Sequence, residues 1–140
     1  MPSSERAPGR RPLGTVVGLG LMALGAAPTM AGDFDGSRVL ICAPVQAFDC
    51  ATGEDCTKGL PEEIGAPAFM RIDVANKAVI GPKRTTAIQL MDKSETQLLL
   101  QGTELGYGWV IAVDQETGKM TATLANREGA VVLFGPCTVP

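Results

Sequence analysis

Apolar and polar residues alternate with a period of two along much of the chain after residue 68. In residues 109–114, Trp109, Ile111 and Val113 share one face, which is the pattern of a half-buried β-strand. The same alternation, or an apolar run of strand length, recurs in five further segments: residues 69–74, 84–91, 97–101, 120–124 and 130–134. The pattern predicts six or seven strands and places Trp109 on the core face.

Short turn-forming segments separate these strands. They are rich in Asn, Asp, Gly and other polar residues, and they lie at residues 75–77, 92–94, 103–106, 115–118 and 126–129. Strands joined by such short connections pair antiparallel with their neighbours. We therefore expect an all-β fold, a small antiparallel meander that closes into a barrel or a sandwich.

Residues 43–67 lack this periodicity and contain three prolines, Pro44, Pro61 and Pro67. Connections of that length are usually either functional or disordered. Residues 61–64 alone predict one helical turn, because proline suits the first helical position and acids suit the positive end. We expect the rest of this segment to be an irregular loop on the β scaffold.

The first 31 residues contain the three parts of a secretory signal peptide. Three arginines make the start basic, residues 15–27 form an uncharged apolar run, and small residues follow. We predict cleavage after Ala31, which leaves residues 32–140 as a single β domain in the periplasm or outside the cell. The alternative is a retained membrane anchor, but a run of about 13 residues is shorter than the roughly 20 that a spanning helix needs.

The four cysteines of the chain all follow the signal peptide. An even number in an exported protein predicts two disulfides. Of the three possible pairings we favour Cys42–Cys137, which joins the first strand to the last, and Cys50–Cys56, which closes around a turn-forming Thr-Gly pair. A four-thiolate zinc site is the alternative, but it needs paired C-x₂-C spacing that the chain lacks. We expect a disulfide-stapled domain without a metal.

Charge and composition narrow the classes of partner and reaction. Residues 32–140 contain 9 Lys+Arg against 14 Asp+Glu, a net charge of −5, which disfavours nucleic acid and anionic lipid as partners. The chain contains no histidine, so it has no Ser-His or Cys-His nucleophile and no histidine metal ligand. A carboxylate pair would be the remaining means of catalysis, with Glu62, Glu63, Asp73 and Asp92 as candidates. We expect no catalytic activity and no cofactor.

Four residues are candidates for binding. Tyr107 is the only tyrosine and lies beside glycines at the start of a strand, where an aromatic ring suits a sugar or a partner's pocket. Glu54 and Asp55 lie in the Cys50–Cys56 loop and Asp49 directly precedes it, and carboxylates at such a place suit calcium or a partner. Neither this group nor the acids at residues 33–35 match the twelve-residue calcium-binding loop, so we expect a solvated loop and a frayed terminus respectively.

Most of the chain after the predicted signal peptide resembles a class of exported proteins. Residues 109–114 together with residues 117–122, and the closing segment 134–138, look like small exported proteins of proteobacteria that have no characterised activity. The overall plan is also similar to the periplasmic barrels that inhibit C-type lysozyme. In that family a serine and a basic residue on a short loop enter the lysozyme cleft, and this chain has no matching Ser-Gly-x-Arg/Lys-Tyr stretch.

These patterns together favour a binding module over an enzyme. We expect a non-enzymatic exported module of the cell envelope, whose partner is a periplasmic or envelope protein, because a stapled loop on a β scaffold is a common way to present recognition residues. An inhibitor of a lytic enzyme and a lipocalin-like carrier of a small apolar ligand are the alternatives. A carrier needs an empty apolar cavity, whereas Trp109, Met70 and Met120 are large enough to fill a small barrel.

Overall fold

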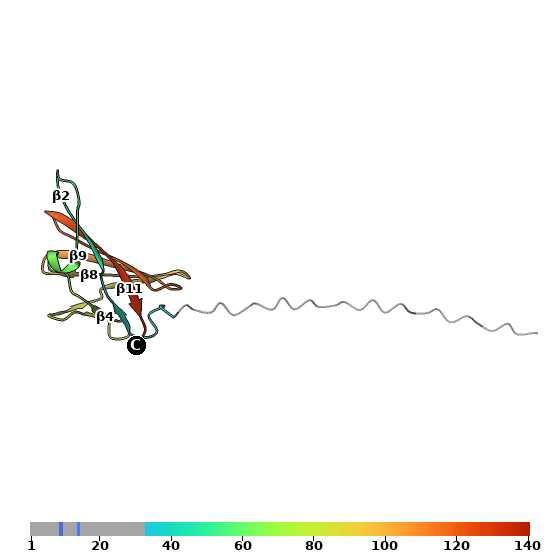
Figure 1. Ribbon diagram of the computed structural model, residues 1–140. Coiled ribbons are helices and arrows are strands. Elements are labelled where there is room, and N and C mark those ends of the chain that lie inside the picture. The colour runs from blue at the N-terminus through green and yellow to red at the C-terminus, as the bar shows by residue number, and fades with distance from the viewer. Residues whose placement is uncertain (1–8, 10–13, 15–32) are drawn as a thin grey trace, which may run out of the picture.

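The computed structural model describes residues 33–140, together with Gly9 and Gly14 (Figure 1). The predicted signal peptide and its cleavage site after Ala31 lie outside the described residues, apart from those two glycines. Among the residues described, no helix is long and apolar enough to cross a membrane. This part of the chain is all-β, as predicted: it has eleven strands, all paired antiparallel, and a single turn of 3-10 helix.

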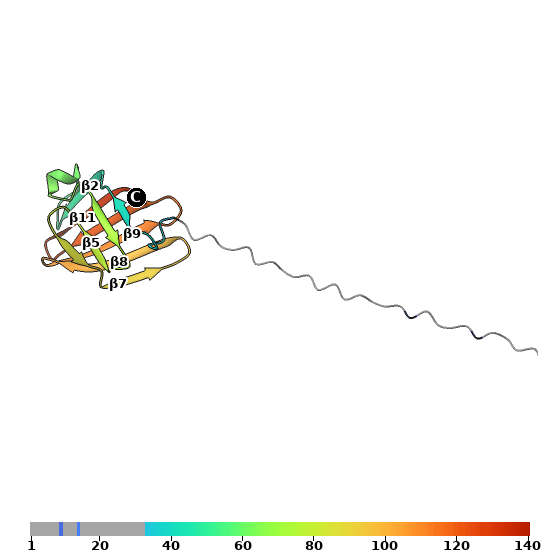
Figure 2. The same cartoon turned by 90° about the horizontal axis from the view of Figure 1, so that it is seen from below.

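The strands follow one another in a curled antiparallel sheet. In chain order the elements are β1 (Leu40–Cys42), β2 (Gln46–Ala51), β3 (Thr57–Gly59), η1 (Pro61–Ile64), β4 (Met70–Asp73), β5 (Ala78–Ile80), β6 (Thr85–Ala87), β7 (Leu90–Lys93), β8 (Gln97–Glu104), β9 (Tyr107–Asp114), β10 (Lys119–Ala125) and β11 (Gly129–Thr138). Their order in the sheet is β6-β5-β4-β1-β11-β10-β9-β8-β7, and β2 and β3 extend it beside β11. Seen from below, the sheet curls into a half-barrel (Figure 2). The predicted meander is confirmed.

β1 and β2 pair with successive parts of β11. Cys42 lies opposite Cys137 and Gln46 lies opposite Phe134. The segment from β1 to β2 therefore advances by four residues while β11 advances by three. The extra residue is a β-bulge between β1 and β2. Gly135 permits it, because a Cβ there would collide with the Ala43 carbonyl oxygen. Past the bulge, the free side of β2 pairs with β3, whereas that of β1 pairs with β4.

The two ends of the sheet order, β6 and β7, are consecutive along the chain. β6 approaches β8, where the Thr86 hydroxyl donates to the Thr103 carbonyl oxygen at 3.2 Å. The prediction of one strand over residues 84–91 is therefore wrong: the chain bends between β6 and β7, which pair with β5 and β8 respectively. Ile88 is buried at the bend, whereas Leu90, expected on the same face, is exposed.

The core occupies the concave face of the half-barrel. Trp109, Ile111 and Val113 on β9 lie opposite Leu124, Ala122 and Met120 on β10 respectively, and the first three are buried. The predicted core position of Trp109 is confirmed, and its indole N–H donates to the Thr86 hydroxyl at 3.3 Å. Other strands contribute fully buried side chains to the same cluster: Leu40, Ile72, Leu98, Leu100 and Leu133.

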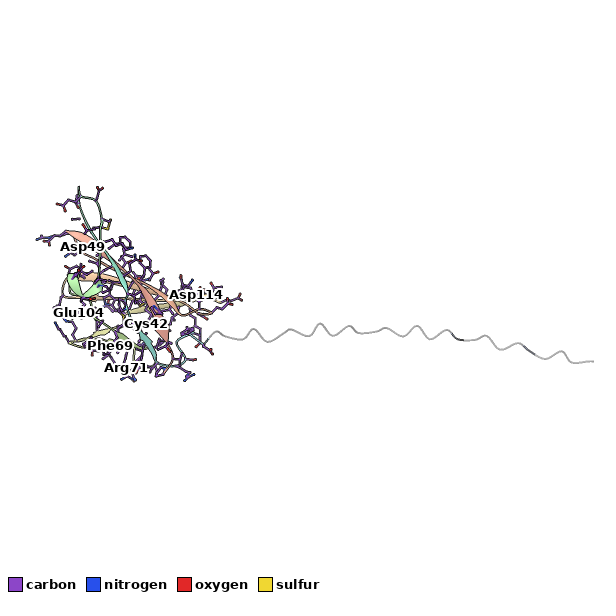
Figure 3. All side chains as sticks on the ribbon, viewed as in Figure 1. Cys42, Asp49, Phe69, Arg71, Glu104 and Asp114 are labelled. Atoms are coloured by element: carbon purple, nitrogen blue, oxygen red, sulfur yellow. A yellow bond between two sulfur atoms is a disulfide. The ribbon has the colours of Figure 1, made fainter. Side chains whose placement is uncertain are left out.

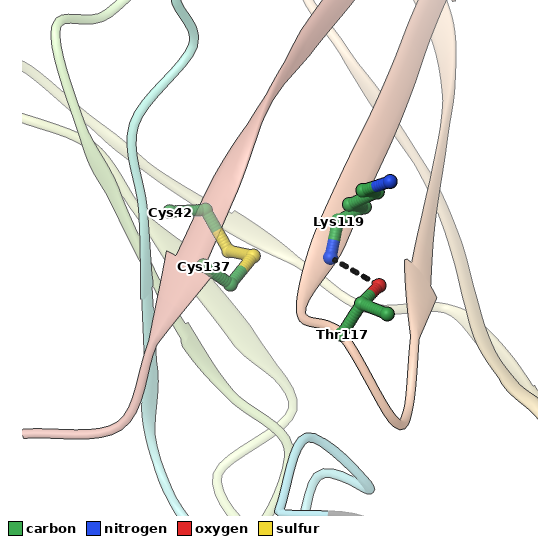
Figure 4. The surroundings of a disulfide bond; sticks show 4 residues. All are labelled: Cys42, Thr117, Lys119 and Cys137. Carbon is green, nitrogen blue, oxygen red and sulfur yellow. Dashed lines mark hydrogen bonds between the residues drawn. A yellow bond between two sulfur atoms is a disulfide. The ribbon is translucent and has the colours of Figure 1, made fainter.

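Both predicted disulfides are confirmed. Cys42–Cys137 joins β1 to β11 across 95 residues, beside the turn that contains Thr117 (Figure 4). Cys50–Cys56 spans 6 residues and closes the turn between β2 and β3, in which Gly53 takes a positive φ of 79°. Two disulfides are typical of proteins in an oxidising compartment outside the cytoplasm.

Residues 43–67 are more regular than the sequence pattern predicts. They contain β2 and β3, so the prediction of an irregular loop is wrong for those two stretches. β3 escaped prediction because it is a three-residue strand at the sheet edge, where no alternating burial marks it. The helical turn predicted at residues 61–64 is confirmed in 3-10 form, and the Leu60 N–H donates to the Glu63 carboxylate at 2.9 Å.

Candidate functional site

One end of the half-barrel is closed by residues 33–37. The ring of Phe34 packs on the turn between β9 and β10, so tightly that a Cβ on Gly118 would lie 2.7 Å from it. Asp35 is buried, and its carboxylate accepts hydrogen bonds from Lys93 Nζ at 2.8 Å and from the Ser37 N–H at 2.9 Å. The prediction of a frayed terminus is therefore wrong from residue 33 onward. We call this region the closed end.

The ion pair at the closed end perturbs the titration of its carboxyl group. The pKa of Asp35 is lowered from 3.8 to about 2, mainly by the hydrogen bond from Lys93 and next by those from Ser37. A carboxylate that accepts several hydrogen bonds is stabilised in its ionised form, and this lowers its pKa. The ion pair of Asp35 with Lys93 thus holds the N-terminal segment against β7.

The opposite end of the strands is open, and we call it the rim. β2 ends there at Ala51, β9 begins at Tyr107, and β10 and β11 meet in the turn after Ala125. The β2–β3 hairpin projects beyond the rest of the sheet at this end (Figure 1). Figure 3 shows Asp49 on the rim side and Asp114 at the other end of the sheet.

A hollow of about 130 Å³ lies at the rim and opens to solvent. Its lining includes Asp49, Cys50, Tyr107, Asn126, Glu128 and Val131. The structure thus brings together two of the predicted binding residues, Asp49 and Tyr107. We call this feature the rim hollow.

Asp49 and Tyr107 meet because both continue the core face of their strands beyond the end of the core. Tyr107 precedes Trp109 by two residues, so it lies on the same face of β9, yet it is 38% exposed where Trp109 is 5% exposed. Asp49 follows the buried Ala47 by two residues and lies opposite Val131. The phenol of Tyr107 and the carboxylate of Asp49 therefore lie at the points where the buried apolar side chains of β9 and β2 end.

The floor of the rim hollow is held by hydrogen bonds of the β10–β11 turn. The Asn126 side-chain oxygen accepts from the N–H groups of Glu128 and Gly129, at 2.9 and 3.1 Å. The backbone of Gly129 passes so close to β2 that a Cβ there would collide with the Cys50 carbonyl oxygen. The hollow therefore has a fixed backbone wall rather than one formed by a long loop.

The other two predicted binding residues lie apart from the hollow. Glu54 and Asp55 are exposed in the turn of the stapled hairpin, and neither lines the rim hollow. The turn is ordered by its disulfide and by the hydrogen bond from the Glu54 N–H to the Ala51 carbonyl oxygen at 3.3 Å. These two carboxylates form a projecting acidic tip beside the hollow.

Sequence reasoning missed Asn126 and Glu128, which the β10–β11 turn contributes, and Val131 of β11. The favoured Cys42–Cys137 pairing could have predicted which part of the chain lies beside Asp49. Extending an antiparallel register from that pair places Asp49 opposite residue 130, one residue from the observed partner, Val131. The bulge between β1 and β2 accounts for the difference.

A second, shallower hollow of about 500 Å³ lies beside the β3 edge. Its lining includes the exposed side chains of Val45, Leu60 and Lys58 together with Glu63. The Glu63 carboxylate accepts the hydrogen bond from the Leu60 N–H described above, so it serves the local fold. This hollow combines apolar and charged groups without an aromatic ring.

The carboxylates considered for catalysis have structural partners or lie apart. Asp73 accepts hydrogen bonds from the side chain and the N–H of Asn76, and these bonds lower its pKa. Asp92 lies on β7, at one end of the sheet order, whereas Glu63 lies on η1, outside the sheet. Among residues 33–140, no group of three or more His, Cys, Asp or Glu side chains is arranged to hold a metal ion.

No protein-family model, curated protein or solved structure matches this chain. Its function must therefore be inferred from the chemistry of the rim. Pockets for drug-sized molecules measure about 300–1,000 Å³, so a hollow of about 130 Å³ suits one inserted group rather than a whole small molecule. An aromatic face, two carboxylates and an adjoining acidic tip form a surface able to recognise such a group.

Proposed function

We propose that this protein is a non-enzymatic binding module of the cell envelope, acting in the periplasm or outside the cell, and that it holds a partner protein at the rim. The observation that carries this proposal is the meeting of Tyr107 and Asp49 in one solvent-open hollow. Binding residues are commonly placed where loops leave a rigid scaffold. The rim has this arrangement, because the hollow lies where four strand ends meet two turns.

The size and lining of the rim hollow indicate which group the partner inserts. A volume of about 130 Å³ accommodates one side chain. The ring of Tyr107 offers an apolar face, and the carboxylates of Asp49 and Glu128 favour a side chain that ends in a positive charge. The ion pair between Glu128 and Arg127 is exposed and 3.7 Å long, so it competes weakly for that carboxylate.

The location outside the cytoplasm rests on two independent features. The paired cysteines need an oxidising compartment to form. The basic start, the short apolar run and the small residues before Gly32 have the order of a secretory signal peptide. A module exported in this way meets proteins of the periplasm, the envelope or the exterior.

Capture from an envelope extract tests the proposal. The immobilised exported protein should retain one or a few proteins, and Tyr107→Ala and Asp49→Asn should reduce their retention by at least ~10-fold, as expected for contact residues at the centre of an interface. Phe134→Ala is the matched control for the aromatic residue, because Phe134 is also 38% exposed but lies on β11 away from the hollow. Asp92→Asn on β7 is the control for the carboxylate. Equal retention by all four variants would overturn the proposal.

A second candidate function is inhibition of a lytic enzyme. The observation that favours it is the stapled hairpin, in which residues 51–58 are all exposed and project beyond the sheet. A rigid projecting loop suits insertion into an enzyme cleft, as in protease–inhibitor complexes. Cell-wall lysis by a muramidase should then slow on addition of the protein, and Glu54→Gln with Asp55→Asn should weaken the effect. An unchanged lysis rate would remove this candidate.

A carrier of small apolar ligands finds no support in the interior. The concave face that would hold the ligand is filled by Trp109, Met120 and Leu100, which are buried in one packed cluster. The two hollows described above are open to solvent and only partly apolar. We therefore favour a partner that docks on the rim.

A further inference from the structure

The two disulfides differ in how far a thiol can reach them. Cys42 and Cys137 are 0% and 7% exposed and belong to the core cluster. Cys56 is exposed, and Cys50 is half-buried in the wall of the rim hollow. Thiol–disulfide exchange requires a thiolate to reach a sulfur atom, so access decides which bond reacts in the folded protein.

The two bonds also differ in what must move for them to open. Cys42–Cys137 joins two strands inside the sheet, where Cys42 pairs with both β11 and β4. Reaching it requires opening of the sheet itself. Cys50–Cys56 clips a hairpin whose outer strand, β3, is three residues long and pairs only with β2. Opening that bond frees a short projecting segment and leaves the core intact.

We propose that Cys50–Cys56 is a reducible latch on the rim hollow, which a dithiol opens in the folded protein while Cys42–Cys137 stays closed. A thiolate of the dithiol attacks Sγ of the exposed Cys56. The Sγ–Sγ bond breaks, and Cys50 leaves as a thiolate that takes up a proton. The second thiol then displaces Cys56 from the mixed disulfide. Two electrons pass from the dithiol to the protein, and the dithiol becomes a disulfide.

Opening the latch alters the wall of the hollow. Cys50 lies between Asp49 and Ala51, and all three residues line the hollow. β3 is held beside Asp49 by three pairs of opposed residues and by the disulfide that closes the turn. Without the disulfide β3 is free to separate from β2, so Asp49 loses its neighbour Thr57 and the Cys50 side chain is no longer tied to Cys56, while the pairing of β2 with β11 persists. The consequence for partner binding rests on the proposed function of the rim, whereas the selective reduction does not.

Alkylation of the native protein tests the selectivity. The exported protein is treated with dithiothreitol without denaturant, then with iodoacetamide, and mapped by mass spectrometry. Cys50 and Cys56 should be labelled at least ~1,000-fold faster than the other pair, because a marginally stable domain is globally open in roughly one molecule in 10³ or fewer. The inference is overturned if all four cysteines react at one rate, or if none reacts before unfolding.

The single tyrosine and the single tryptophan report the effect on the hollow. NMR of the aromatic rings should show the Tyr107 signal shift on reduction and return on reoxidation, while the Trp109 signal stays in place. The Cys50→Ala/Cys56→Ala variant should show no response to dithiothreitol. A Tyr107 signal that does not move after selective reduction overturns the latch, even if rim variants lose the partner. If the signal moves but Tyr107→Ala still retains the partner, the latch stands and the proposed function fails.

Discussion

The closed end and the rim lie at opposite ends of the same strands, yet they use similar residue types in different ways. Each has an aromatic residue and a carboxylate, which lie in the segment before β1 at the closed end and in strands β9 and β2 at the rim. At the closed end Phe34 packs on Gly118 and Asp35 is buried against Lys93. At the rim Tyr107 and Asp49 face an open hollow.

The difference lies in whether the polar groups are already satisfied. Asp35 has two hydrogen-bond donors from its own chain, and Gln115, buried at the same end, donates to the Ser94 carbonyl oxygen at 2.8 Å. A fully paired buried group stabilises the fold and has little left to offer a ligand. Exposed carboxylates and a half-exposed ring retain their hydrogen-bonding and packing capacity, which supports our proposal that the rim binds a partner while the closed end stabilises the fold.

The largest effect should separate the two disulfides. In the chain-entropy model, Cys42→Ala/Cys137→Ala removes a loop constraint worth roughly 4–5 kcal/mol, and Cys50→Ala/Cys56→Ala removes one worth roughly 2 kcal/mol. Urea unfolding of both variants measures the free energies. If loss of Cys50–Cys56 lowered the free energy of unfolding more than loss of Cys42–Cys137, the assignment of stability to the closed end would be wrong.

The next comparison uses two aromatic residues on the same face of β9. Trp109→Ala removes a buried side chain and should lower the free energy of unfolding by roughly 3–5 kcal/mol. Tyr107→Ala, two residues away, should cost less than ~1 kcal/mol, because the ring is already partly in solvent. Thermal melts of the two variants measure the difference. Similar melting temperatures would mean that the rim ring is structural and would weaken its assignment to recognition.

Much of this division could be predicted from the sequence where a pattern is local. Alternation placed Trp109, Ile111 and Val113 in the core, and the Thr-Gly pair between Cys50 and Cys56 indicated that disulfide. Tyr107 and Asp49 were predicted individually from their residue types. That they share a hollow depends on the pairing of β2 with β11, whose shifted register comes from the bulge.

The closed end escaped prediction because its contacts are long-range and use ordinary residues. Lys93 is 58 residues from Asp35 in the chain, and no periodic pattern connects them. An acidic segment directly after a predicted cleavage site resembles a frayed tail until the β7 strand is placed beside it. The bend at Ile88 was missed for a related reason, since an alternating run continues across it while the pairing partner changes from β5 to β8.

Two turn glycines provide a matched test of packing at the two ends. Gly118 and Gly106 both take positive φ angles, 70° and 83°, so alanine is strained at either position. At Gly118 a Cβ would also meet the Phe34 ring at 2.7 Å and the Cys137 carbonyl oxygen at 2.9 Å, whereas at Gly106 it would meet nothing within 4 Å. We expect Gly118→Ala to cost roughly 2–3 kcal/mol and Gly106→Ala roughly 1 kcal/mol in urea unfolding. Equal costs would show that Phe34 does not hold the closed end.

The smallest effect concerns the ion pair between Asp35 and Lys93. Because the pKa of Asp35 is lowered from 3.8 to about 2 in the folded protein, its contribution is fully present above pH ~4 and is lost as pH falls toward about 2. The Lys93 side chain is 43% exposed, so after allowance for solvent screening we expect the pair to contribute roughly 1–2 kcal/mol. Asp35→Asn should lower the free energy of unfolding by that amount at neutral pH, and the difference from wild type should disappear as the pH falls through this window.

The control is Asp92→Asn, which changes an exposed carboxylate on β7 and should lower the free energy of unfolding less at neutral pH. A gap that persists unchanged at pH ~2 would mean that Asp35 acts through its shape and neutral hydrogen bonds rather than its charge, and the closed end would then depend on Phe34 and the buried disulfide.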